Sequence, residues 1–278
     1  MNYRNTLKEK KRIVVKIGTR SLSFPNGRIN YSRLEKLTMV LSDIRSSGKE
    51  VILISSGAVG IGANRLKMEC PPDALIPRQA LASIGQAELI RIYQKFFDEY
   101  GQMVAQVLLT RDGLDDEQRR NNAVNTLNEL LLMKVIPIIN ENDTVSTAEI
   151  QFGDNDNLSA KVSVMLKADI LILLTDTDGL YTSDPEHHPE AERIRVVEEI
   201  NQELESVIYQ SSSAFGKGGM SSKLNAARLC MNNNIDTAII NGNDPKNLYR
   251  LMAGEDIGTL FISPQVNKQN IVINKYLK

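Results

Sequence analysis

Six short apolar runs, separated by longer stretches of helical periodicity, restrict the fold more than any other feature of this sequence. The runs cover residues 12–17, 50–54, 103–109, 135–139, 169–174 and 236–240. Each is rich in β-branched residues and is bounded by polar residues or glycine, which is typical of strands buried on both faces of a parallel sheet. We therefore expect these runs to be strands of one mainly parallel sheet.

The stretches between the runs are expected to form helices. Residues 31–48, 77–101 and 116–134 carry apolar side chains at helical spacing, and Gly48 and Gly101 stand where a helix commonly ends in a glycine. Strands that alternate with helices predict βαβ crossovers and helices on both faces of the sheet. The 278 residues suffice for one large α/β domain or for two small ones.

Three other segments have weaker patterns. Residues 258–265 and 270–278 are expected to be additional strands that close an edge of the sheet. The polar, proline-containing segment 182–194 is expected to be a loop or a hairpin.

Polar clusters follow four of the expected strands. Their sequences are GTRS after residue 17, SSGAVGIGANR after residue 54, NENDTVSTAEIQFGDNDN after residue 139 and TDTDGLYTSDP after residue 174. Ligands of open α/β sheets bind beyond the carboxyl ends of the strands. One such cluster is most simply a turn, whereas four at the same edge of a sheet indicate a binding site.

The segment GDNDNLSAK, residues 153–161, carries more polar residues than a helix start needs. It places two aspartates and two asparagines beside one glycine, directly before an apolar, helix-like stretch. One Asp or Asn is enough to cap a helix. Because the N–H groups of a helix start also favour anions, the surplus predicts a functional site at this point.

Composition excludes several classes of function. The 33 basic and 34 acidic residues leave no overall basic field, so neither nucleic acid nor an anionic membrane is an expected partner. The two cysteines, Cys70 and Cys230, are too few for a disulfide framework. The polar amino terminus lacks the apolar stretch of a signal peptide, and no later run is as long as a membrane span. These features predict a cytosolic protein.

Several common catalytic arrangements are also missing. No GxxxxGK[ST] motif is present, and GAVGIGANR lacks the GxGxxG spacing. The two histidines, His187 and His188, are adjacent within the polar segment 182–194, where we expect them to be exposed. A histidine general base, a Ser-His-Asp triad and a zinc site are therefore not expected.

A lysine in the first strand and a second glycine-rich segment point to phosphate chemistry. Lys16 is costly to bury in an apolar strand unless it faces a site at the strand end. Residues 211–223, SSSAFGKGGMSSK, precede a helix-like stretch, so their backbone N–H groups and Lys223 could reach phosphate oxygens. Two lysines and two glycine-rich loops suit phosphoryl transfer. A carboxylate acceptor is already ionised at neutral pH, so it would need no general base.

Nine segments together resemble the amino acid kinase family. In the family's order they are VVKIGTRSL, ISSGAVGIG, PRQALASIGQAELI, QVLLTRDGL, NTLNELL, VIPIINENDTV, FGDNDNLSA, LLTDTDGLYTSDP and GKGGMSSKLNAA, and the resemblance covers about residues 12–262. A VxK strand followed by glycine is shared by carboxylate, carbamate and nucleotide kinases of the family. INEND followed by GDNDNLSA resembles the members that phosphorylate glutamate.

The resemblance implies a three-layer α/β/α sandwich with a mainly parallel central sheet. Residues 1–278 would form a single amino acid kinase domain, with the amino acid bound by the N-terminal part and ATP with Mg²⁺ bound by the C-terminal part. The implied reaction transfers the γ-phosphate of ATP to the side-chain carboxylate of L-glutamate, as the first step of proline biosynthesis. Many members carry a further C-terminal PUA domain, for which a chain ending at Lys278 is expected to have no room.

The resemblance also implies three sets of site residues, matched position by position. The catalytic set is Lys16 and Lys223, which would stabilise charge on the transferring phosphoryl group, and Asp156, which would orient both lysines. The amino-acid set is Ser56, Gly57, Ala58, Asp143 and Asn155. The ATP set is Lys16, Gly18, Thr19, Thr175, Asp176, Lys217, Gly218, Gly219, Met220, Ser221, Ser222 and Lys223. No protein ligand is assigned to magnesium, which would be held mainly through ATP.

The implied partners are small molecules and related chains. L-Proline would be a feedback inhibitor, the chain would form a homo-oligomer (a dimer or tetramer), and glutamyl phosphate reductase would be the pathway partner. Two alternatives stay open. Another carboxylate or carbamate kinase of the same fold would keep the lysines but should lack the INEND and GDNDN pairing. A non-catalytic amino-acid sensor could keep Asp143 and Asn155 while losing the lysines.

Overall fold

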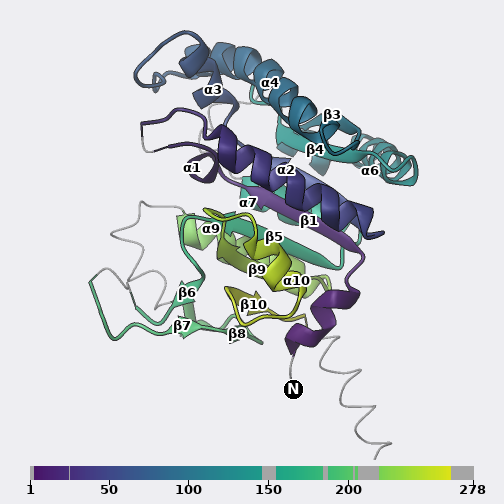
Figure 1. Cartoon of the computed structure of the whole chain (residues 1–278), viewed down its shortest axis with the longest axis vertical. Coiled ribbons are helices and arrows are strands. Elements are labelled where there is room, and N and C mark those ends of the chain that lie inside the picture. Colours follow the sequence, from purple (N-terminus) through teal and green to yellow (C-terminus); the bar gives the residue numbers. More distant parts are fainter. Residues whose placement is uncertain are drawn as a thin grey trace, which may run out of the picture.

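The computed structural model describes residues 3–24, 26–145, 155–183, 187–202, 204–205 and 219–263. Within these ranges the centre of the molecule is an eight-stranded sheet (Figure 1). From one edge to the other, its strands are β3 (Val104–Leu109), β4 (Ile136–Glu141), β2 (Glu50–Ser55), β1 (Arg12–Ile17), β5 (Ile170–Thr175), β9 (Asp236–Asn241), β10 (Thr259–Phe261) and β8 (Val196–Val197). Neighbouring strands are parallel except for the antiparallel pair β9–β10.

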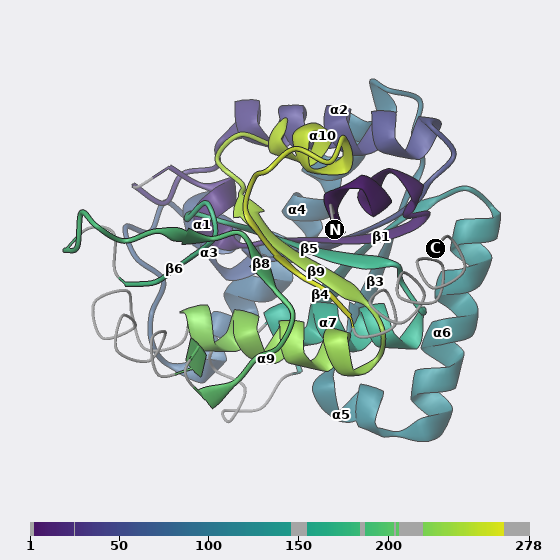
Figure 2. The ribbon, with the colours of Figure 1, turned by 90° about the horizontal axis from the view of Figure 1, so that it is seen from below.

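Helices cover both faces of this sheet, which confirms the three-layer α/β/α class (Figure 2). One layer contains the 3₁₀ helix η1 (Tyr3–Glu9), α1 (Thr19–Leu22), α2 (Tyr31–Ser46), α3 (Ala58–Arg65), α4 (Leu75–Asp98) and α10 (Asn247–Met252). The opposite layer contains α5 (Arg111–Asp115), α6 (Glu117–Leu132), α7 (Asn155–Met165) and α9 (Gly219–Asn232). Two separate apolar cores lie between these layers and the sheet.

The central strand β1 shows how the sheet places a lysine in the interior. Ile13, Val15 and Ile17 belong to the core on the α2 side, whereas Val14 belongs to the core on the α7 side. Side chains alternate between the two faces of a strand. Lys16 is two residues after Val14, so it points to the same face and lies toward α7. The cation therefore lies between the end of the sheet and the start of that helix.

The six expected strands are all present and run parallel to one another in the sheet, and the three expected helices are present as α2, α4 and α6. Gly48 and Gly101 follow α2 and α4 with φ values of 90° and 64°, so the predicted glycine helix ends are confirmed. The polar segment around the two histidines is flanked by a hairpin, in which β6 (Leu180–Tyr181) pairs antiparallel with β7 (Arg193–Ile194). Both histidines are exposed, as predicted.

Two expectations about the fold were wrong. The strand expected within residues 258–265 forms β10, but it lies one position inside the edge, which β8 occupies. A two-residue strand is too short to leave a recognisable pattern in the sequence. The other expected strand, at 270–278, lies outside the described residues.

The second error concerns the segment SSGAVGIGANR, which was expected to be a glycine-rich loop. It is helix α3 from Ala58 onwards, despite the low helix propensity of glycine. A Cβ atom on Gly62 would lie 2.0 Å from the backbone oxygen of Leu81, and one on Gly85 would lie 1.7 Å from that of Ala58. These glycines therefore allow the backbones of α3 and α4 to approach each other closely.

Candidate active site

The carboxyl ends of β1, β2, β4 and β5 meet the amino ends of α7 and α9 at one edge of the sheet. This is the edge at which the polar clusters of the sequence were predicted to gather. The segment GDNDNLSAK does begin a helix, since α7 starts at Asn155. Asp154 and the rest of its loop lie outside the described residues.

Three charged side chains from three elements meet at this edge. Nζ of Lys16, from β1, lies 2.5 Å from Oδ1 of Asp156, in the first turn of α7. Nζ of Lys223, from α9, lies 3.2 Å from Oδ2 of the same carboxylate. All three side chains are nearly buried, with 11%, 5% and 12% exposure for Lys16, Asp156 and Lys223. The two lysines and one carboxylate leave one net positive charge in a space with little water.

The pKa of Asp156 reflects this arrangement. Burial alone would raise the pKa, but the charges of Lys16 and Lys223, with hydrogen bonds from Lys16 and Ser222, outweigh it and lower the pKa to about 2. The carboxylate is therefore ionised at any pH at which the protein would work. It can hold two ammonium groups side by side that would otherwise repel each other.

Further hydrogen bonds fix both Asp156 and Lys223. The hydroxyl of Ser222 donates to Oδ2 of Asp156 at 2.7 Å, and Nζ of Lys223 donates to the carbonyl of Gly219 at 2.8 Å. Ser222 was predicted only as a nucleotide contact, so its link to Asp156 was missed. A serine before a lysine at a helix start gives no sign of which carboxylate it will meet.

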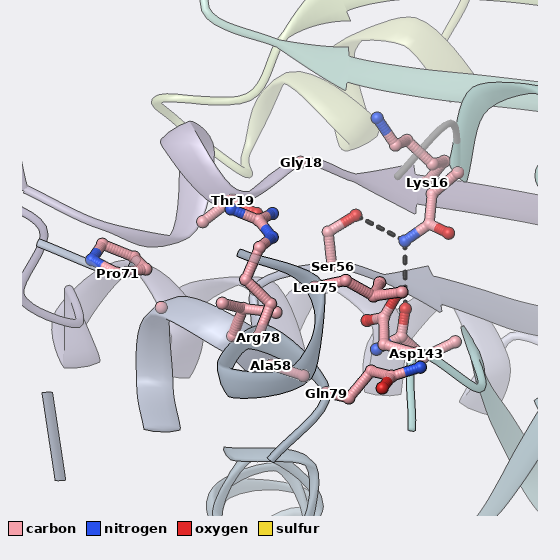
Figure 3. Close-up of a pocket in the computed structure, with 15 residues that line it drawn as sticks. Lys16, Gly18, Thr19, Ser56, Ala58, Pro71, Leu75, Arg78, Gln79 and Asp143 are labelled. Carbon is pink, nitrogen blue, oxygen red and sulfur yellow. Dashed lines mark hydrogen bonds between the residues drawn. The ribbon is translucent and has the colours of Figure 1, made fainter. Parts of the chain in front are cut away.

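A cavity of about 350 Å³ opens beside Lys16 (Figure 3). It is lined by Lys16, Gly18, Thr19, Ser56, Gly57, Ala58, Val59, Gly60, Pro71, Leu75, Arg78, Gln79, Asn140, Asp143 and Asn155. Every residue that was predicted to contact the amino acid is in this set. Gly57 is among them, with a φ of 105° that lets the chain turn sharply from β2 into α3. A volume of this size suits a small molecule.

A buried amide network forms one wall of the cavity. Nδ2 of Asn155 lies 2.6 Å from Oγ of Ser56, 3.1 Å from the carbonyl of Ser55 and 3.0 Å from Oδ1 of Asn140. Nδ2 of Asn140 in turn donates to Oε1 of Gln86 at 2.7 Å. Among the described residues nothing donates to Oδ1 of Asn155, which is buried. This oxygen is an acceptor that a bound ligand could satisfy.

Asp143 supplies the negative charge of the cavity. Burial raises its pKa, and the nearby positive charge of Arg78 offsets part of that rise. A carboxylate in this position can bind an ammonium group. Asn140, Arg78, Gln79, Leu75 and Pro71 also line the cavity but were not predicted.

The other side of the charged cluster is more open. Oγ1 of Thr175, at the end of β5, donates to Oδ1 of Asp176 at 3.0 Å, and Arg20 lies 3.5 Å from the same carboxylate. Burial acts to raise the pKa of Asp176, but the bond from Thr175 and the charges of Arg20 and Lys223 leave it lowered. Asp176 is thus within electrostatic reach of the lysine cluster. Of the predicted ATP residues, Lys217 and Gly218 lie outside the described residues.

The donor set bears on how a magnesium ion could be held. No group of three or more His, Cys, Asp or Glu side chains with metal-binding geometry occurs in the described part of the chain. Asp156 engages Lys16 and Lys223 with its two oxygens. These residues are compatible with a Mg²⁺ ion that takes most of its ligands from ATP phosphates, and that assignment stays a prediction.

The fold and this edge of charged and polar residues define a class of phosphate-transferring proteins. The sequence profile of the amino acid kinase family matches residues 11–241, and the chain belongs to that family. It is 49% identical to a glutamate 5-kinase of Clostridium perfringens over 264 residues, which are 94% of this chain and 98% of the relative. A glutamate 5-kinase of Enterococcus faecalis is 46% identical over 263 residues, which are 93% and 97% of the two chains.

Solved structures support the fold independently. The structure of UMP kinase from Ureaplasma parvum superimposes with a TM-score of 0.63 at 16% identity, covering 91% of this chain and 99% of that one. The product complex of T. acidophilum isopentenyl phosphate kinase gives 0.60 at 17% identity, covering 90% and 100%. At this identity the likeness concerns the fold alone.

Among the described residues, no helix is both long and apolar enough to cross a membrane.

Proposed function

We propose that this chain is an ATP-dependent kinase that transfers the γ-phosphate of ATP to the side-chain carboxylate of L-glutamate, giving L-glutamyl 5-phosphate and ADP. The observation that carries the proposal is the buried cluster of Lys16, Asp156 and Lys223, which opens on a cavity that holds one further carboxylate, Asp143. The near full-length identity to glutamate 5-kinases supports the choice of substrate.

The cluster suits the charge that moves during phosphoryl transfer. Negative charge spreads over the oxygens of the transferring group, and cations fixed in advance stabilise that state without having to rearrange. Lys16 and Lys223 supply these cations, and Asp156 holds them in position. Magnesium bound to the ATP phosphates would add positive charge on the nucleotide side. The acceptor carboxylate is ionised at neutral pH, so no general base is required.

Three groups would hold the glutamate. Asp143 pairs with the α-ammonium, and the buried Oδ1 of Asn155 accepts a further hydrogen bond. Ser56, which is fixed by Asn155, contacts the acceptor side of the substrate. The nucleotide lies on the other side of the lysines, against Thr175, Asp176 and the segment 217–223. Gly18 and Thr19, at the start of α1, lie between the two substrates.

Regulation and assembly are part of the same proposal. L-Proline shares an ammonium and an α-carboxylate with glutamate, so it competes for the amino-acid cavity. The chain works in the cytosol as a homo-oligomer, a dimer or tetramer, and its product passes to glutamyl phosphate reductase. Glutamate titrations at fixed proline should raise the apparent KM; an unchanged KM with a lower kcat would contradict an overlapping site.

The test of the function is ADP release with a panel of amino acids and simple carboxylates, with magnesium and ATP in excess. L-Glutamate should be the substrate that is turned over, and Asp156→Asn should abolish most of this activity in a folded protein. Turnover of a different carboxylate or of carbamate would identify another kinase of the same fold. Glutamate binding without ADP release would identify an amino-acid sensor.

A further inference from the structure

The charged side chains that line the cavity form a small and uneven set. Among its lining residues they are Lys16, Asp143 and Arg78. Lys16 is paired with Asp156 at the end where phosphate would be transferred. Asp143 would pair with the ammonium group of the substrate. The role of the second cation, Arg78, is not explained by either assignment.

Arg78 lies in the first turn of α4 and is partly buried. Its side chain extends from this helix toward Gly18 and Thr19, at the start of α1 (Figure 3). Within the described residues, its guanidinium has no hydrogen bond and no ion pair within 4 Å. It does influence Asp143 through space, because its charge acts to lower the pKa of that carboxyl.

Helix stability does not account for a cation at this place. The amino end of a helix carries a partial positive charge, so a positive side chain in the first turn is unfavourable by about 0.3–1 kcal/mol. The first turn of α4 has no acidic residue, and Ala74 offers no side-chain cap. A guanidinium that lines a cavity under these conditions is best explained by an anion that it binds.

The charges of the proposed substrate match those of the cavity. Glutamate carries a side-chain carboxylate, an α-ammonium and an α-carboxylate, and the last two are attached to one carbon atom. Lys16 lies at the transfer end, and Asp143 and Arg78 are near enough to each other to interact electrostatically. The planar fork of an arginine can donate two parallel hydrogen bonds to a carboxylate.

We propose that Arg78 is a specificity-determining residue that binds the α-carboxylate of the amino acid while Asp143 binds its ammonium. This inference rests on the proposed function, since it takes glutamate as the substrate. Together the two residues would bind the ammonium and the α-carboxylate of glutamate. Lys16 would then be near the side-chain carboxylate only. The pair would therefore set which end of glutamate faces ATP.

The test combines an arginine variant with a substrate that lacks the α-carboxylate charge. Arg78→Gln should lower kcat/KM for L-glutamate about 10- to 100-fold, through KM, because a charge-assisted hydrogen bond is lost. The KM for ATP should stay within about two-fold. L-Isoglutamine keeps the side-chain carboxylate and ammonium but replaces the α-carboxylate by a neutral amide. Wild-type enzyme should use it poorly, and Arg78→Gln should use it no worse than wild type.

Controls separate this proposal from folding and from the function itself. Arg91→Gln makes the same change on the exposed part of the same helix, where Arg91 pairs with Glu88, and should leave both substrates unaffected. Arg78→Lys keeps the charge without the fork and should recover part of the glutamate activity. Equal losses for glutamate and isoglutamine in a stable Arg78→Gln protein would overturn the role of Arg78. Wild-type enzyme that does not phosphorylate glutamate at all would instead overturn the proposed function.

Discussion

The proposed amino-acid side and the proposed nucleotide side of the site are built in different ways. On the amino-acid side, Asn140, Asn155 and Gln86 are 2%, 4% and 8% exposed and are joined by direct hydrogen bonds. On the nucleotide side, Arg20 and Asp176 are 79% and 45% exposed and lie 3.5 Å apart. An exposed pair of this kind contributes little to stability, so the described nucleotide side is held less firmly.

This difference follows from what each substrate brings to the site. A small amino acid offers few contacts, so its selection depends on donors and acceptors that are already fixed when it arrives. ATP carries a large base, a ribose and several charges, and can therefore order part of its own surroundings. Asp156 joins the two sides, because it holds Lys16 of β1 and Lys223 of α9 with one carboxylate.

The largest expected effect comes from breaking this junction. Lys223→Ala should lower kcat about 10²- to 10³-fold with modest changes in either KM, since fixed cations of this kind act mainly in the transition state. Asp156→Asn keeps the size of the side chain but removes the charge that holds both lysines, so its defect should resemble that of Lys223→Ala. The measurement is kcat at saturating magnesium-ATP and glutamate.

The double variant shows whether the three residues act as a unit. Asp156→Asn combined with Lys223→Ala should lose far less activity than the product of the two single losses. Fully multiplicative losses would mean that the residues act independently. Each variant needs a thermal melt, because a buried lysine without its carboxylate destabilises the fold and imitates a loss of catalysis.

A second large effect, on stability, should come from disturbing the close contact of α3 and α4. These helices border the amino-acid side, so that side should be affected first. Gly85→Ala places a Cβ 1.7 Å from the carbonyl oxygen of Ala58, so the helices must separate. We expect a loss of about 3 kcal/mol in the free energy of unfolding. Gly60→Ala in α3 is the matched control, because the nearest atom to its Cβ is 3.9 Å away. A Gly85→Ala protein as stable as the control would contradict this account of the packing.

The amino-acid side also marks the limit of what the sequence could predict. The six strands and their shared edge followed from apolar runs and from the polar residues after them, because each depends on local pattern. Helix α3 could not be predicted in this way, because its glycines have a low helix propensity. Its formation depends on close packing against Leu81 and Gly85 of α4, which the local sequence does not reveal. Tertiary contact outweighed local propensity at this segment.

The site shows the same division. Lys16 and Asp156 could be singled out because a charged residue in an apolar strand and a surplus of carboxylates are visible in one sequence. Arg78 and Gln86 lie on α4 among residues of ordinary helical composition, so nothing local separates them from a solvent-exposed face. Only the packing of α4 against α3 and the strand ends brings them to the cavity and to Asn140.

A smaller effect is expected when the ammonium partner is removed. Asp143→Ala should raise KM for glutamate about 10- to 100-fold, which is the range of a hydrogen bond between charged groups. The KM for ATP should be nearly unchanged, because Asp143 lines the amino-acid cavity. Steady-state titrations of each substrate test this separation. A variant with a raised KM for ATP and a normal KM for glutamate would move Asp143 to the nucleotide side.

The smallest expected effect is a shift in pH dependence, and it separates the two carboxylates of the site. The pKa of Asp156 is lowered to about 2, whereas burial raises the pKa of Asp143. As pH falls, Asp143 is therefore protonated first and can no longer bind the ammonium, so kcat/KM for glutamate should decline while the lysine cluster stays intact.

Arg78→Gln tests the direction of this pH shift. The cations that line the cavity with Asp143 are Arg78, from α4, and Lys16, from β1, and the charge of Arg78 acts on the Asp143 carboxyl. Removing Arg78 removes a charge that lowers the pKa of Asp143, so this pKa rises further and the acid limb of kcat/KM for glutamate should move to higher pH. Glutamate itself titrates identically with both enzymes, so the difference between the two profiles belongs to the protein. The limb for ATP, measured at saturating glutamate, should not move, and neither should either limb in Arg91→Gln. An acid limb for glutamate that coincides in wild type and Arg78→Gln would show that Asp143 is not the group that limits activity at low pH.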